Sequence, residues 1–305
     1  MDAYDLCITT DWEHDREFFD LLSLSLRVYG LSTFQVSLIN LRETINKLRE
    51  GSLAFRYLLD RASTTSPEFL ELYETMSEGG IFPCLDDPRT MLWTADKATM
   101  HLEFLSRGIR IPHTIILNPH CSAREISLSI HDLESLGLPF IIKPASTTGG
   151  GIGVFKNGRS LEDIIRVRRE YGDNMYLLQE KVTPFEIDTK RFWFRVFYIC
   201  GLELATWWND ETHVYETLTD QQVSRYRLFP LYETLRQIAD ICKLNFFSTE
   251  IVVTAGWQFV VVDYVNEVCD LRLRSSFPDG VPNCVVYTIT RRIAEHIVSE
   301  LRGIT

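Results

Sequence analysis

The sequence lacks the features of a membrane-spanning or disulfide-rich protein. No apolar run approaches the ~20 residues that a membrane-spanning helix requires. The first residues, MDAYDLCITTDWEHD, lack the basic-then-apolar order of a secretory signal. The seven cysteines are scattered, without a CxxC pair or a His-Cys cluster at zinc spacing. We therefore expect a cytoplasmic protein with reduced thiols and no membrane partner.

Basic residues are scarce relative to acidic ones. Lys and Arg number 31 against 42 Asp and Glu, which gives a formal net charge of −11. A surface of this sign repels a phosphate backbone, so we expect no nucleic-acid partner. Internal repeats, low-complexity tracts and long linkers are also absent. With 305 residues, the chain is long enough for two or three compact domains.

Residues 1–90 predict a small parallel sheet with helices on its faces. The segments YDLCITT and STFQVSLI have the composition of strands, and a helical pattern around residues 15–29 separates them. A third strand, SLAFRYLLD, precedes the helical segment SPEFLELYETM, for which we expect Ser66 as N-cap and Pro67 in the first turn. This β-α-β-α order is typical of an α/β domain.

Residues 91–178 are expected to form a second unit. Its first helix, over residues 94–107, should be capped by Thr94 and ended by Gly108. The strand segments are IPHTIIL, PFIIKPA and MYLLQEKV. The segments SAREISLSIHDLESLG and SLEDIIRVRREYG are predicted to be helices, the first ending on Gly137 and the second beginning at a serine cap.

Residues 179–305 are rich in strands. The segments TKRFWFRVFYIC, LELATWWN, NFFSTEIVV and WQFVVVDYV carry this pattern, and helices are expected over 230–243 and 283–301. Gly201 and the pair Ala255–Gly256 predict antiparallel hairpins between consecutive strands. The chain therefore predicts a parallel N-terminal unit followed by two α+β units.

A glycine-rich loop is the strongest functional signal. In PFIIKPASTTGGGIGV, four glycines free the backbone so that successive N–H groups can close on phosphate oxygens, and Lys143 ends the preceding strand. A P-loop is excluded because GxxxxGK[ST] is absent, and a dinucleotide-binding turn because a strand, rather than a helix, follows the glycines. We expect the tip of a β-hairpin that folds over a nucleotide; the alternative is a glycine hairpin without a ligand.

Five segments occur in the order found in one superfamily. They are TADKATMHLEFLSRGIRIPHT, PFIIKP, LLQEKV, RVFYICG and STEIVVTAGWQFVVVDYVNE, within residues 90–275. In these segments the chain resembles the ATP-grasp superfamily, whose members mostly couple ATP cleavage to the joining of a carboxylate to an amine or a thiol. The resemblance implies an ATP-grasp fold, α/β and α+β, with an N-terminal Rossmann-like pre-ATP-grasp domain. It also implies ATP and Mg²⁺ as cofactors.

The resemblance assigns a role to residues in each segment. The phosphates of ATP would lie against two lysines and a flap at 147–153, namely Lys97, Lys143, Thr148, Gly149, Gly150 and Gly151. The adenine would lie against the hinge strand and the ribose against a carboxylate, namely Gln179, Glu180, Lys181, Val182 and Glu186. Magnesium would bind Glu250, Asp263 and Asn266, because hard cations prefer oxygen ligands. Arg195 would lie near the γ-phosphate.

The chain departs from the superfamily pattern in three places. The metal strand usually reads E-x-N, whereas Asp263 and Asn266 are three residues apart and would face opposite sides of a regular strand unless it bulges or ends at Val265. Otherwise Glu267 or Asp270 could replace Asn266. Trp193 occupies a position, two residues before Arg195, at which members of the superfamily often have an acidic residue. Trp207 and Trp208 lie where a further basic residue often lies, so we expect an unusual acceptor site.

Arg272 and Arg274 follow the metal strand and alternate by two residues. The simplest interpretation makes them surface charges. A basic pair beside the metals could also hold an anionic substrate through bidentate contacts. We favour this functional role for Arg272, whereas Trp207, Trp208 and Tyr264 are predicted to be packing aromatics.

The leading hypothesis is an ATP-dependent carboxylate–amine ligase that acts on small-molecule carboxylate and amine substrates through an acyl phosphate. The first alternative is a small-molecule kinase on the same scaffold, in which a hydroxyl attacks the phosphoryl group directly. The second is a non-catalytic nucleotide-binding protein, which the irregular metal strand suggests. The sequence does not identify the substrates, and it is compatible with a homodimer.

Overall fold

The computed structural model describes residues 1–77, 81–119, 128–146, 151–171 and 175–303. The chain forms two compact units. The first unit comprises Met1–Leu92, Arg195–Ser248 and Glu267–Thr305, and the second comprises Trp93–Phe194 and Thr249–Asn266. The division into ATP-grasp subdomains at 1–90, 91–178 and 179–305 remains a prediction.

The first unit contains the parallel sheet that the sequence predicts. Its strands are β1 (Asp2–Thr9), β2 (Thr33–Val36), β3 (Leu53–Leu59) and β4 (Cys84–Leu85), in the order β2-β1-β3-β4. Each neighbouring pair is parallel. Parallel sheets are usually covered on both faces, which explains why β3 reads as a nearly continuous apolar run.

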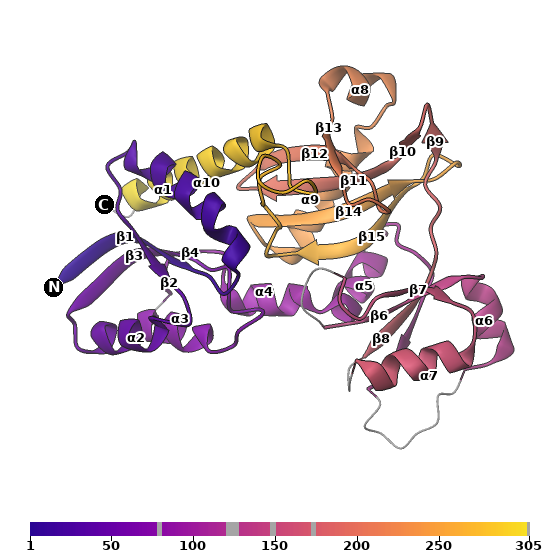
Figure 1. Ribbon diagram of the computed structural model, residues 1–305, viewed down its shortest axis with the longest axis horizontal. Helices are drawn as coiled ribbons and strands as arrows, with labels where there is room; N and C mark the ends of the chain where they lie inside the picture. The colour runs from indigo at the N-terminus through magenta and orange to yellow at the C-terminus, as the bar shows by residue number, and fades with distance from the viewer. Residues whose placement is uncertain (78–80, 120–127, 147–150, 172–174, 304–305) are drawn as a thin grey trace. The chain divides into compact units, whose positions relative to one another are not determined.

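Helices cover both faces of this sheet (Figure 1). One face forms an apolar core with α1 (Arg16–Arg27) and α10 (Asn283–Gly303). The other face packs on α2 (Leu41–Arg49) and α3 (Phe69–Met76). A short 3-10 helix, η1 (Glu13–Asp15), links β1 to α1.

One local prediction in the N-terminal region was wrong, and one helix was missed. The Ser66 cap is displaced, because α3 begins at Phe69 after Glu68, and the Ser66 hydroxyl instead donates to the Asp11 carboxylate at 2.9 Å. The missed helix is α2. Its apolar residues Leu41, Ile45 and Leu48 recur at helical spacing, so the signal was present in the sequence.

A five-stranded sheet has the order β13-β12-β11-β14-β15. Its strands are β11 (Trp193–Ile199), β12 (Leu202–Trp208), β13 (Tyr215–Thr217), β14 (Phe246–Val253) and β15 (Phe259–Asn266). The predicted hairpin at Gly201 is confirmed. Cys200 and Gly201 connect neighbouring strands and both have positive φ, 48° and 84°, as a type I′ turn requires. The helices α8 (Asp220–Arg225) and α9 (Pro230–Cys242) follow β13 and precede β14.

The second unit contains a four-stranded antiparallel sheet in the order β5-β8-β6-β7. Its strands are β5 (Thr114–Leu117), β6 (Phe140–Pro144), β7 (Phe155–Gly158) and β8 (Tyr176–Glu180). The helices α6 (Ile130–Leu136) and α7 (Leu161–Glu170) share its apolar core, and Figure 1 shows them beside it. The small hairpin of β9 (Glu186–Ile187) and β10 (Lys190–Arg191) follows.

The helix predicted over residues 94–107 is two helices, α4 (Pro88–Ala95) and α5 (Lys97–Ser106). The cap is Asp96 rather than Thr94. Its Oδ1 accepts a hydrogen bond from the Thr99 amide at 2.6 Å, whereas Thr94 lies inside α4. The predicted end at Gly108 is confirmed by its φ of 72°. No helix within the described ranges is long and apolar enough to cross a membrane.

Gly158, the last residue of β7, has no space for a side chain. An added Cβ would lie 2.6 and 2.8 Å from two carbons of the Phe140 ring. We expect Gly158→Ala to lower the free energy of unfolding by about 1–3 kcal/mol through overpacking. Gly256→Ala is the matched control in the same unit, because its nearest neighbours would be 3.8 Å away. Thermal unfolding of both variants tests this; equal melting temperatures would contradict the steric account.

Candidate functional site

The ammonium group of Lys143 joins the strand before the glycine loop to the predicted metal strand. Lys143 lies in β6 and is 5% exposed. Its Nζ donates to the carbonyl oxygen of Val262 in β15 at 3.1 Å. It also lies 4.9 Å from the centre of the Tyr264 ring. The structure thus brings Lys143 next to the backbone that carries Asp263, as the predicted nucleotide site requires.

Burial of Lys143 lowers the pKa of its ammonium to about 8, from 10.5. The negative charge of Asp263 opposes this shift, Lys97 adds to it, and Glu250 again opposes it. Asp263, Lys97 and Glu250 therefore each lie within electrostatic range of the Lys143 ammonium. The nearby carboxylates offset the charge of this buried ammonium only in part. Such a cation has a strong preference for an added anion such as a phosphate.

Lys97 approaches the same place from α5. Its backbone N–H donates to the carbonyl of Ala145 at 2.9 Å, just after β6 ends. This bond fixes the first residue of α5 beside the start of the glycine loop. The two predicted phosphate lysines thus come from different elements and converge at the carboxyl end of β6.

The glycine loop connects β6 to β7, which pair in antiparallel fashion. This confirms the predicted hairpin. Thr148, Gly149 and Gly150 lie outside the described residues. Gly151 and Gly153 have φ of 73° and 77°, which few other residues adopt. At Gly153, a Cβ would also lie 3.2 Å from the Pro144 ring, a tight contact that adds to the preference for glycine at this position.

The predicted metal ligands lie on β14 and β15, which are neighbours in their sheet. Asn266 Nδ2 donates to Asp263 Oδ2 at 3.0 Å. Asp263 and Asn266 therefore meet despite their spacing of three residues. Glu250 Oε2 accepts a hydrogen bond from the indole N–H of Trp193 at 2.9 Å. This contact of Trp193, a residue that departs from the superfamily pattern, was not predicted from the sequence.

The donors available to a cation are carboxylate and amide oxygens. Among the described residues, no group of three or more His, Cys, Asp and Glu could hold a metal ion without other ligands. Two carboxylates and one amide suit Mg²⁺, which usually keeps waters and substrate phosphates among its ligands. The donor set thus fits a metal that arrives with a nucleotide.

A chain of hydrogen bonds lies beneath Lys143. The Tyr264 hydroxyl lies 2.8 Å from His101 Nδ1 and accepts from Gln179 Nε2 at 2.7 Å. Gln179 Nε2 also donates to Thr114 Oγ1 at 3.0 Å. Burial, with the nearby charge of Lys143, lowers the pKa of His101 to about 4, so the ring is neutral at pH 7. This network holds β15, β8, β5 and α5 together under the lysine.

The residues predicted for adenine and ribose lie around the end of β8. The Gln179 amide is 3% exposed and serves the network described above. Glu180 accepts from the backbone N–H of His113 at 2.9 Å. Glu186 is exposed in β9 and pairs with Arg191. The nucleotide contacts of Gln179, Glu180, Lys181, Val182 and Glu186 remain predictions.

The two predicted catalytic arginines belong to the first unit. The guanidinium of Arg195 lies 5.3 Å from the centre of the Trp208 ring. Arg272 pairs with Asp270 at 2.7 Å and with Asp279 at 3.0 Å. The hydrogen bonds that Arg272 donates to Asp270 raise the pKa of Arg272 further, despite partial burial. Two carboxylates already compensate Arg272, and its role toward a substrate remains a prediction.

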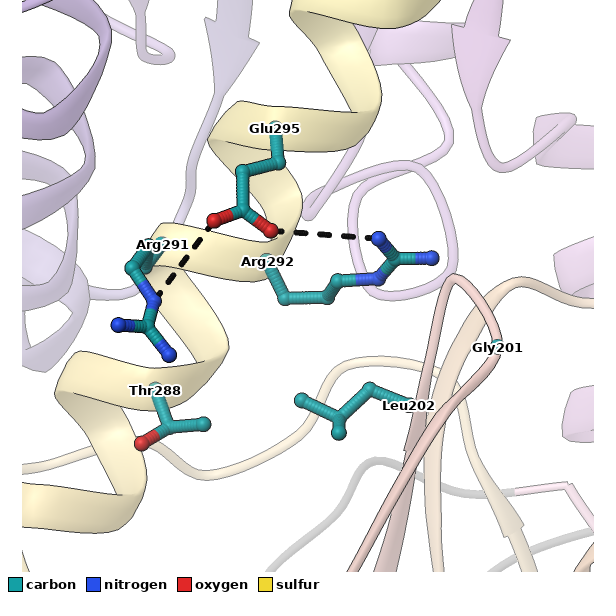
Figure 2. Close-up of a pocket in the computed structure, with 6 residues that line it drawn as sticks. All are labelled: Gly201, Leu202, Thr288, Arg291, Arg292 and Glu295. Atoms are coloured by element: carbon teal, nitrogen blue, oxygen red, sulfur yellow. Dashed lines mark ion pairs between the residues drawn. The ribbon is translucent and has the colours of Figure 1, made fainter.

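A separate cavity of about 300 Å³ lies in the first unit between α10 and the β11–β12 turn. Figure 2 shows its lining, in which Glu295 faces both Arg291 and Arg292, at 3.7 and 4.0 Å. Arg292 also donates to the carbonyl of Cys200. None of the lining residues is a predicted site residue, and the two cations share one carboxylate.

The chain is similar in structure to several solved proteins. No family model and no curated protein matches the sequence. A RimK-domain ATP-grasp protein from Sphaerobacter thermophilus matches with a TM-score of 0.63 and 18% identity, over 95% of this chain and 98% of that protein. A D-alanine–D-alanine ligase from Bacillus anthracis complexed with ATP matches with a TM-score of 0.65 and 13% identity, over 100% of both chains.

A third match, the ATP-grasp ligase PsnB complexed with a minimal precursor, Mg and ADP, has a TM-score of 0.61 and 13% identity, over 97% of this chain and 98% of that one. All three matches span nearly the whole chain, including both the parallel N-terminal sheet and the antiparallel sheets. The chain therefore has the ATP-grasp fold.

Proposed function

We propose that the protein binds magnesium–ATP and uses the γ-phosphate to activate a carboxylate, as an acyl phosphate, for attack by an amine or a thiol. The observation that carries the proposal is the hydrogen bond from the Lys143 ammonium to the carbonyl of Val262, the residue before Asp263. It supports one site in which a phosphate-binding lysine and metal-binding carboxylates act on the same triphosphate.

In this proposal, the residues of the chain bind and align the nucleotide. The ammonium groups of Lys97 and Lys143, with backbone N–H groups of the glycine loop, offset the charge of the phosphates. Bound magnesium supplies charge neutralisation on the transferred phosphoryl group. Arg195 adds a planar donor near the γ-phosphate, and Arg272 holds an anionic group of a substrate.

No covalent nucleophile on the protein is needed. The substrate carboxylate attacks the γ-phosphorus, and the bond to ADP breaks. The amine or thiol then attacks the acyl carbon, and inorganic phosphate leaves. The protein aligns the reactants and excludes water from the acyl phosphate.

Calorimetric titration with a non-hydrolysable ATP analogue tests the first half of the proposal. We expect saturable binding in the presence of magnesium, weakened at least tenfold when EDTA removes the metal, because both metal carboxylates then face the triphosphate without a bridging cation. Absence of magnesium-dependent binding would overturn the proposal.

Product analysis across a panel of carboxylates and amines tests the second half. A ligase releases ADP and inorganic phosphate in equal amounts, and only when both substrates are present. A phosphorylated product without free phosphate would instead identify a kinase. Tight binding without turnover across the panel would favour a non-catalytic nucleotide-binding protein.

A further inference from the structure

Both predicted metal carboxylates have one oxygen engaged by a neutral N–H donor. Trp193 Nε1 donates to Glu250 Oε2 at 2.9 Å, and Asn266 Nδ2 donates to Asp263 Oδ2 at 3.0 Å. All four residues belong to the second unit. The donors are an indole and an amide, which carry no charge and so leave the negative charge of each carboxylate in place.

Ca²⁺ and Mg²⁺ differ in how many oxygens of one carboxylate they tend to bind. Ca²⁺ takes about six to eight oxygens at ~2.3–2.6 Å and often binds both oxygens of one carboxylate. Mg²⁺ takes about six at ~2.0–2.1 Å in nearly octahedral geometry. A hydrogen bond to one carboxylate oxygen makes two-oxygen binding costly, because the bond must be broken first.

Trp193 is well placed to impose this restriction on Glu250. It begins β11, and Glu250 lies in β14, the next strand of the sheet. Two sheet strands fix the backbone at both ends of the contact. The indole is planar and has a single N–H, so its direction is set by only two side-chain torsions.

We propose that Trp193 is a specificity-determining residue whose indole N–H limits Glu250 to one metal-facing oxygen and thereby favours magnesium over calcium. This inference rests on the proposed function, because it concerns the metal that accompanies ATP. It assigns a purpose to a residue at a position where the superfamily often has an acidic side chain.

Calorimetry on the full-length protein tests the inference. A non-hydrolysable ATP analogue is titrated in the presence of excess Mg²⁺, and separately of excess Ca²⁺, and the ratio of the two dissociation constants is the readout. We expect the unsubstituted protein to prefer the magnesium complex. In Trp193→Phe, which removes the N–H and keeps an aromatic ring, the preference should shrink about tenfold, as loss of one hydrogen bond to a charged group implies.

Two further variants separate selectivity from general damage. Trp193→His retains a ring N–H and should retain more of the preference than Trp193→Phe does. Trp207→Phe removes another indole donor, whose partner is the amide oxygen of Gln222 at 3.3 Å in the first unit, and should leave the ratio unchanged. A Trp193→Phe ratio equal to that of the unsubstituted protein overturns the inference, as does an equal weakening of both complexes.

A measurement on the unsubstituted protein covers the case in which Trp193→Phe does not fold. A ¹⁵N–¹H spectrum of the indole groups reports whether the Trp193 N–H is hydrogen-bonded, and its signal is assigned by its loss in Trp193→His. In the magnesium complex the chemical shift should remain that of a hydrogen-bonded N–H. In the calcium complex the signal should move. Equal positions in both complexes overturn the inference. If neither complex binds the unsubstituted protein, the proposed function fails as well; if only the preference is absent, the inference alone fails.

Discussion

The Lys143→Met variant should lose nucleotide affinity and unfold at a higher temperature. We expect binding of an ATP analogue to weaken about 100-fold or more, because one partner of a desolvated charge pair is removed. The ammonium is buried and its pKa falls from 10.5 to about 8. At ~1.4 kcal/mol per pKa unit, the buried charge costs on the order of 3 kcal/mol. After the lost bond to Val262 is subtracted, the variant should gain on the order of 1–2 kcal/mol.

The stability gain should depend on pH. Below about pH 8, Lys143 is protonated in both the folded and the unfolded chain, so the full cost of the buried charge is present. Between about 8 and 10.5, the folded chain releases this proton and the unfolded chain keeps it, so the unsubstituted protein recovers stability as the pH rises. The advantage of Lys143→Met, measured by urea unfolding, should therefore be larger at pH 7 than at pH 10.

Lys47→Met is the matched control. Lys47 is a surface lysine of α2 that pairs with Glu43 one turn away. Its replacement should leave nucleotide affinity unchanged and have little effect on stability, because an exposed ion pair contributes little. If Lys143→Met binds the nucleotide as tightly as Lys47→Met does, the assignment of the phosphate site is wrong.

The Asp15→Asn variant should destabilise the first unit by about 3–5 kcal/mol, the cost of leaving one partner of a buried ion pair uncompensated. Arg61 binds Asp15 through two hydrogen bonds of 2.9 and 2.6 Å, and the side chains are 0% and 1% exposed. Arg61 also donates to the carbonyl of Cys269 at 2.8 Å. This pair ties the start of α1 to the end of β3 and to the segment that follows β15.

Urea unfolding of Asp15→Asn, compared with Glu43→Gln at an exposed pair, measures the effect. Glu43→Gln should have little effect on the free energy of unfolding, because an exposed ion pair contributes little. A double variant, Asp15→Leu with Arg61→Met, replaces the pair with apolar side chains and should recover much of the loss. A cost below ~1 kcal/mol for Asp15→Asn would show that solvent reaches the pair, since exposed pairs contribute about that much.

Helix caps and helix ends were predictable where they depend only on residues close in the sequence. Ser160 caps α7 as expected, since its hydroxyl accepts from the Asp163 amide at 3.2 Å. Gly137 ends α6 with a φ of 71°. The Ser66 cap failed because Asp11, 55 residues away, takes its hydroxyl. Thr94 and Asp96 are both good cap residues, and only the break between α4 and α5 selects Asp96.

Site residues were predictable from the sequence where the motif around each one indicates its role. Lys143 and Asp263 were identified from two separate segments, and the structure joins them through Val262. The supporting contacts were not predictable. Trp193 meets Glu250 across 57 residues, and His101 meets Tyr264 across 163 residues. No periodicity or local motif encodes such pairs, because they follow from strand order and from packing beneath the strands.

The buried imidazole beneath Lys143 sets a lower limit on the pH that the second unit tolerates. Burial lowers the pKa of His101 to about 4, from 6.5 as its ordinary value. Acidification across this interval therefore draws protons to the unfolded form and weakens the fold. The same protonation would place a second cation next to Lys143 and remove the neutral ring that bonds to Tyr264. Acid inactivation would thus originate in a side chain to which no nucleotide contact is assigned.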